Sequence, residues 1–172
     1  AISYAKETAN LLDSELITLS VGDVSENELE ELSKYGASKI LSTNRLEKVD
    51  SQALSSIIEK LVEKNGVDTI IFSNSYTSKM AAPRLAIKLN AGLLSNVVTI
   101  AMSITPFQVK KKVFSGKAFE IAETNTAKRI LMIVPNAFTI NKSTNEPILI
   151  FSLIDDIFGK RIISLPFSDY TE

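Results

Sequence analysis

The chain has 172 residues, of which 45% are hydrophobic, and it carries 19 Lys or Arg against 20 Asp or Glu. It contains no Cys and no His, which excludes disulfides, thiolate zinc sites, iron–sulfur ligation and every Ser-His-Asp triad. The interspersed charges create no global field towards nucleic acid, and no apolar run approaches the ~20 residues of a membrane span. We therefore expect one soluble domain with a substantial core, without nucleic-acid partners or membrane insertion.

The chain is predicted to open inside a helix. Residues 1–13 are rich in helix formers, with Ile2, Ala5 and Ala9 on one stripe, and residues 16–21 follow as a strand. A doubly wound sheet normally begins with a strand. We therefore expect the first strand of this sheet to be missing.

Two further helix and strand pairs follow. Ser25 and Glu28 have the spacing of a capping box, and residues 37–42 form a strand. Asp50 can cap a longer helix that ends at Asn65-Gly66. This alternation favours parallel strands joined by right-handed crossovers.

Residues 67–96 are predicted to form the central strand, helix and strand unit. The apolar run that includes Ile70, Ile71 and Phe72 is typical of a buried parallel strand. The helix after it places apolar residues on one face, and Asn90 with Gly92 can end it.

A polar turn joins that strand to its helix, at the edge where open α/β sheets usually bind ligands. Its candidate nucleotide-contacting or anion-contacting residues are Ser73, Asn74, Ser75, Thr77, Ser78 and Lys79. Helix capping and loop solvation are the favoured interpretation, because the turn contains no Gly-rich phosphate cradle.

After Gly92 the helical period disappears for about forty residues, and strands separated by turn residues are predicted instead. These strands cover residues 97–104, 107–115, 118–123 and 128–134. Lys110 to Lys112 are expected on a solvated edge face rather than in a docking patch. A polar loop at 136–147 precedes a final strand at 148–154. Asp155-Asp156 is expected to be a helix cap or surface pair rather than a metal site.

Four stretches resemble the N-terminal domain of the electron transfer flavoprotein α subunit. They are LSKYGASKIL at 32–41, SKMAAPRLAIKLNAGLLSNV at 78–97, FSGKAFEIAET at 114–124 and NAF at 136–138. The resemblance covers nearly the whole chain in one register. The chain departs from the residues usual in the family at Ser78, Asn96, Phe114 and Pro135.

The resemblance implies a role in a heterodimer that carries electrons from flavin dehydrogenases to an acceptor. In the family this domain packs against the β subunit, and the two form a base for a flavin domain. We expect the C-terminal FAD-binding domain to be absent from this chain, so no cofactor-binding, catalytic or metal-ligating residue is transferred to it. The implied protein is an electron carrier component and not an enzyme. It would work in the bacterial cytoplasm or the mitochondrial matrix, of which the cytoplasm is favoured.

Together these observations predict a three-layer α/β sandwich over residues 1–172, with a mostly parallel, Rossmann-like central sheet and an antiparallel meander over 97–134. The meander is the expected β-subunit interface, because an antiparallel sheet can leave one face free. Residues expected to supply its apolar part are Phe107, Phe114, Phe119 and Ile121, some of which must instead line the core. Arg84 is either an interface ion-pair partner or part of a solvated helix face. The alternative function is a stand-alone nucleotide-binding α/β domain that uses the 73–79 loop.

Overall fold

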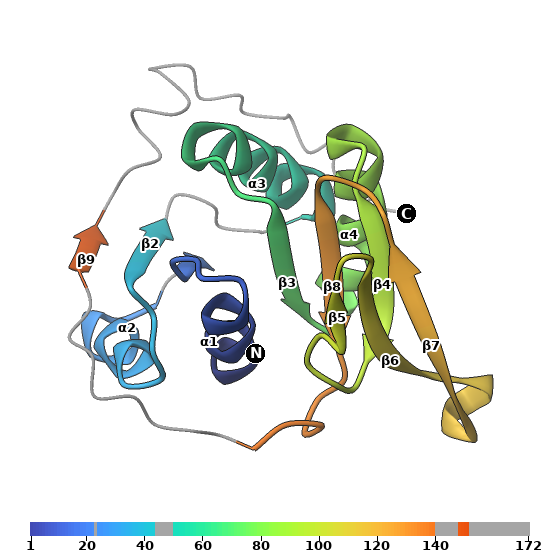
Figure 1. Ribbon diagram of the computed structural model, residues 1–172. Coiled ribbons are helices and arrows are strands. Elements are labelled where there is room, and N and C mark those ends of the chain that lie inside the picture. The colour runs from blue at the N-terminus through green and yellow to red at the C-terminus, as the bar shows by residue number, and fades with distance from the viewer. Residues whose placement is uncertain (23, 44–49, 140–147, 152–172) are drawn as a thin grey trace, which may run out of the picture.

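Figure 1 shows the computed structural model of the chain, which describes residues 1–22, 24–43, 50–139 and 148–151. The elements up to the fourth helix are α1 (Ile2–Leu11), β1 (Ile17–Val21), α2 (Glu26–Ser33), β2 (Lys39–Thr43), α3 (Ser51–Asn65), β3 (Thr69–Ser73) and α4 (Tyr76–Leu89). The later elements are β4 (Gly92–Val97), β5 (Ser103–Ile104), β6 (Phe107–Val113), the short 3₁₀ turn η1 (Phe114–Gly116), β7 (Ala118–Thr124), β8 (Arg129–Ile133) and β9 (Ile148–Phe151).

The predicted helix boundaries have the expected chemistry. The backbone N–H of Ser25 donates to a carboxylate oxygen of Glu28 at 3.1 Å, which completes the predicted capping box of α2. Hydrogen bonds from Ser25 also lower the pKa of Glu28. Asp50 accepts from the N–H of Ala53 at 2.6 Å and caps α3, which ends at Gly66 with a left-handed φ of 64°.

The strands form two sheets. One contains β1, β2 and β9, all parallel, and the other has the order β3-β8-β4-β6-β5, with β7 paired to β6. Strands β3, β8 and β4 are parallel, whereas β6 is antiparallel to its neighbours β4, β5 and β7. The structure is therefore an open, mostly parallel α/β sandwich, as the sequence predicted.

Two predicted strands are placed differently. Residues 97–104 are not one strand, because β4 ends at Val97 and β5 contains only Ser103 and Ile104. The strand predicted at 128–134 is β8, which lies between β3 and β4 and is parallel to both, so it does not belong to the antiparallel meander. Its run Ile130 to Ile133 is apolar without alternation and buried, which is typical of a central parallel strand.

Burial in β3 reflects the position of that strand at the border of its sheet. Ile70 is 9% exposed, but Ile71 and Phe72 are only half-buried. Since β3 pairs with β8 alone among the described strands, its side chains have fewer neighbours than a central strand provides.

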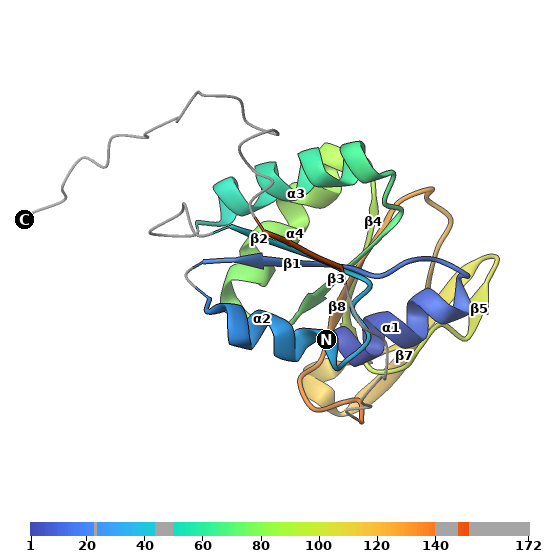
Figure 2. The same cartoon turned by 90° about the vertical axis from the view of Figure 1, so that its left-hand side faces the viewer.

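Helices cover both faces of the parallel part of the larger sheet, which contains β3, β8 and β4. In Figure 2, α3 and α4 lie on one side of the strands and α1 and α2 on the other, where α2 packs on the smaller sheet through Leu29 and Ile40. The α1 side buries Tyr4, Leu94, Val97, Phe107, Val109, Leu131 and Ile133. The α3 and α4 side buries Ile58, Val62, Ile70, Ala82, Leu85, Ile130 and Met132. None of the described helices has the length and apolar character to cross a bilayer.

Several predictions lie outside the described residues. They are the loop beyond residue 139, the end of the last strand at 152–154, and Asp155-Asp156. The part of the last strand that is described, β9, pairs in parallel with β2.

Candidate functional site

In the predicted ligand loop, residues 73–79, three polar side chains form hydrogen bonds within the protein. Ser75 is the N-cap of α4, where its hydroxyl accepts from the backbone N–H of Ser78 at 3.2 Å and lies 2.7 Å from the Ser78 hydroxyl. Asn74 donates to the side-chain oxygen of Asn96 at 3.1 Å, which links the ends of β3 and β4. Three of the polar side chains in this loop therefore have a structural role, either in capping α4 or in bridging two strand ends.

The start of α4 is capped from within this loop rather than left open to a ligand. The Ser75 side chain takes an N–H group at the start of α4 that a phosphate would need. Two buried side-chain atoms lack a hydrogen-bond partner among the described residues, Thr18 Oγ1 and Arg129 Nε, and they lie on strands of different sheets. Neither belongs to the loop, so these atoms do not mark a shared ligand site.

The described residues also form no group of three acidic, His or Cys side chains that could hold a metal ion.

The hairpin of β6, η1 and β7 forms the second candidate site, and its two faces differ. Phe107 and Val109 of β6 are 1% and 0% exposed and pack into the core on the α1 side. The alternate positions, which include Lys110 and Lys112, lie opposite Ile121 and Phe119 of β7. Because side chains alternate along a strand, these four side chains share the outward face.

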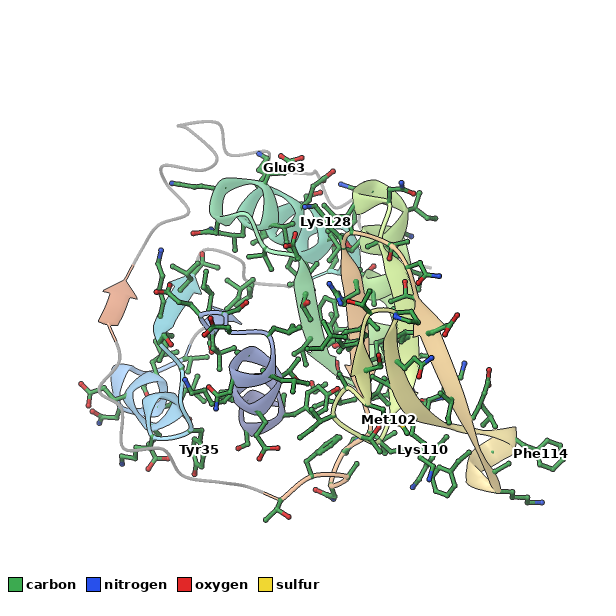
Figure 3. All side chains as sticks on the ribbon, in the orientation of Figure 1. Tyr35, Glu63, Met102, Lys110, Phe114 and Lys128 are labelled. Atoms are coloured by element: carbon green, nitrogen blue, oxygen red, sulfur yellow. The ribbon has the colours of Figure 1, made fainter. Side chains whose placement is uncertain are left out.

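That outward face has large apolar side chains on its surface. Phe119 is 56% exposed and Ile121 is 58% exposed, while Phe114 in η1 is 78% exposed. Figure 3 shows Phe114 at the far end of the hairpin, away from the body of the domain. We call Phe114, Phe119 and Ile121 the hairpin patch.

Lysine side chains accompany the hairpin patch. The Lys110 ammonium lies 5.0 Å from the ring centre of Phe119, and the Lys117 ammonium lies 5.8 Å from that of Phe114. Both contacts are within cation–π range. The patch is therefore aromatic and cationic together, which favours a partner surface with apolar pockets and carboxylates.

Phe107 does not belong to this surface, and its prediction as an interface residue was wrong. It points to the core face of β6, where the Arg129 guanidinium stacks 4.5 Å from its ring centre. Alternation along β6 places Phe107 on the same face as Val109, and the structure shows that this face is the buried one.

Arg84 lies exposed on α4, on the other side of the larger sheet from α1, and is not part of the hairpin. The structure thus separates Arg84 from the other interface candidates. Sequence reasoning missed three exposed residues of the same helix, Tyr76, Met80 and Ile87.

Comparison with known proteins assigns the chain to a family. A family model described as an electron transfer flavoprotein domain matches residues 1–154. The chain belongs to the electron transfer flavoprotein family. The resemblance predicted from the sequence is thereby confirmed.

Two curated relatives bear on its place in this family. The chain is 27% identical over 126 residues to the electron transfer flavoprotein subunit alpha of Bacillus subtilis strain 168, covering 72% of the chain and 39% of that protein. It is 23% identical over 150 residues to the lactate dehydrogenase (NAD(+),ferredoxin) subunit LctC of Acetobacterium woodii, covering 85% of the chain and 36% of that subunit. The chain therefore spans less than two-fifths of the length of either relative.

Proposed function

We propose that this chain is the N-terminal domain of an electron transfer flavoprotein α subunit and acts as a scaffold that binds the β subunit. The complete heterodimer would hold FAD and carry electrons from flavin dehydrogenases to an acceptor, in the cytoplasm. Membership of the family and the similarity to an α subunit support this assignment.

The observation that supports a binding role most directly is the exposure of the hairpin patch. Three large apolar side chains within eight positions of one hairpin are more than half exposed. Interface centres are enriched in aromatic side chains, and exposed apolar clusters mark sites of association. The parallel part of the sheet is covered by helices, so the hairpin offers the free apolar strand face.

A scaffold role also agrees with the chemistry available. The chain has no His or Cys for proton transfer, thiol chemistry or soft metal ligation. Of the polar side chains in the 73–79 loop, Ser75 and Ser78 are engaged in capping α4 and Asn74 in the bridge to Asn96. We therefore assign FAD binding to the rest of the α subunit and electron transfer to that flavin, with this domain holding the β subunit in place.

Size-exclusion chromatography with the β subunit tests the proposed function. The chain and the β subunit of the same organism are purified separately, mixed and applied to the column. Co-elution as a one-to-one complex is expected. Separate elution of two folded proteins would show that the domain does not carry the subunit interface.

A further inference from the structure

Helix α4 has an apolar line on the side that faces away from the core. Tyr76 and Ile87 are 80% and 84% exposed, Met80 is 46% exposed, and Pro83 is exposed as well. These four residues are spaced by four, three and four positions. We call them the α4 seam.

The α4 seam lies opposite the buried face of its helix. With about 100° of rotation per residue, the four seam positions fall within about 60° of one another. The buried residues of α4 are Ser78, Ala81, Ala82 and Leu85. Their average direction is about 180° from the seam, so the most outward line of the helix is apolar where a surface helix is normally polar.

Spacing of this kind is the signature of helix-to-helix packing. Apolar residues that alternate by three and four positions form the seam of a coiled coil, in which side chains of each helix fit between those of the other. From Tyr76 to Ile87 the seam is about 16 Å long, or three turns. It therefore offers enough length to pack one partner helix.

Cations flank the α4 seam on both sides. Lys79 lies about 70° to one side of the seam centre and Arg84 about 70° to the other. Both residues are exposed, and neither forms an ion pair with another described residue. In paired helices these flanking positions select the partner through opposite charges.

We propose that the α4 seam binds an amphipathic helix of a partner protein, with apolar residues at the same spacing and Asp or Glu on both flanks. A second copy of α4 is a poorer occupant, because Lys79 and Arg84 would meet the same cations across a two-fold axis. The seam and the hairpin patch are on different elements, so this site is separate from the proposed β-subunit interface.

Two designed peptides of about 14 residues test the proposal. Both are stapled into a helix and carry Leu at the seam spacing, but one has Glu on both flanks and the other has Lys. Each is titrated into the ¹⁵N-labelled chain while amide shifts are recorded. The Glu peptide is expected to bind at least about tenfold more tightly than the Lys peptide, with shifts concentrated on α4 and with affinity falling as salt rises.

Variants of the chain make the test specific. The double variant Lys79→Glu, Arg84→Glu should reverse the preference so that the Lys peptide binds more tightly. Its matched control, Lys110→Glu with Lys112→Glu on the hairpin, makes the same change in net charge and should leave the preference unaltered. Met80→Gln with Ile87→Gln should abolish binding of both peptides without lowering the melting temperature, because both side chains are exposed.

Three results would overturn the proposal. The first is absence of Glu-peptide binding at millimolar concentration, and the second is equal affinity for the two peptides. The third is self-association of the chain that Ile87→Gln removes, which would make a second copy the occupant.

Discussion

The hydroxyl of Tyr4 donates a hydrogen bond to the backbone carbonyl oxygen of Thr99 at 3.1 Å, across 95 positions of sequence. Tyr4 lies on α1 and is 1% exposed, and its ring packs 4.4 Å from that of Phe138. The bond fixes α1 against the segment that follows β4. Burial raises the pKa of Tyr4 to about 12.

Because of this raised pKa, the free energy of unfolding depends on pH in the alkaline range. Between pH 10 and 12 Tyr4 loses its proton in the unfolded chain but keeps it in the folded one, so the free energy of unfolding falls as pH rises. The loss should reach about 2 kcal/mol near pH 12.

Tyr4→Phe should cost about 1 kcal/mol at pH 7, because it removes the bond to Thr99, and should flatten the decline between pH 10 and 12. Urea unfolding of both proteins across this range measures the difference. Parallel pH profiles for the two proteins would contradict the account.

Position 92 requires a glycine because the side chains of Thr124 and Thr126 lie too close to its Cα for a Cβ, and not because of its backbone angles. A Cβ at this position would overlap the hydroxyl of Thr124 and lie 2.8 Å from that of Thr126. Gly92→Ala should therefore destabilise the fold by about 1 to 3 kcal/mol.

Thr124→Ala in the same chain should restore part of that loss, because it removes the closest atom and leaves the Thr124 Cβ. Thermal unfolding of the wild-type chain, the two single variants and the double variant gives a double-mutant cycle for the free energy of unfolding. Simple additivity of the two single losses would show that the predicted overlap does not govern stability at Gly92.

The same residue shows how far the sequence could predict the structure. The Asn90 and Gly92 pair correctly predicted the end of α4, and Asn90 is the left-handed cap with φ of 50°. The crowding of Gly92 by Thr124 depends on how β4 and β7 are placed in the folded sheet, which local sequence patterns do not contain. Local signals likewise placed the caps at Ser25 and Asp50 but could not order the strands.

For the candidate surfaces too, local patterns predict which residues share a face but not which face is buried. Alternation along β6 and β7 predicts that Phe119 and Ile121 share a face, but only the packing on the α1 side shows that Phe107 faces the core. The α4 seam was visible in the spacing of Tyr76, Met80 and Ile87. It was missed because apolar residues on a helix are first interpreted as core.

FAD retention tests the assignment of flavin binding to another part of the subunit. We expect the purified chain, mixed with FAD and passed through a desalting column, to emerge without flavin absorbance. Stoichiometric flavin in the protein fraction would assign a cofactor site to this domain, with the 73–79 loop as its first candidate.

The boundary between the two sheets gives a further prediction. In the described part of the chain β1 pairs only with β2, and β3 only with β8. Leu19 of β1 packs in the same cluster as Ile70 of β3, so the two strands are neighbours beneath α3. One more parallel strand between them would join the sheets and cover both free edges.

We therefore expect that a parallel strand supplied between β1 and β3 raises the melting temperature by about 5 °C or more and reduces self-association. Differential scanning calorimetry and sedimentation velocity measure the two effects. Unchanged values in both would count against a strand at this position.

Isothermal titration calorimetry of the β subunit into the chain tests most directly the claim that the hairpin patch binds this subunit. Two variants carry the same substitution at different sites. Ile121→Asp alters the hairpin patch, where the isoleucine is 58% exposed, and Ile87→Asp alters an isoleucine on α4 that is 84% exposed. The account predicts that Ile121→Asp weakens binding at least about 30-fold, the effect of 2 kcal/mol at an interface centre, while Ile87→Asp changes it less than about threefold. Equal affinity of the wild-type chain and Ile121→Asp, or loss of binding in Ile87→Asp alone, would contradict the hairpin interface.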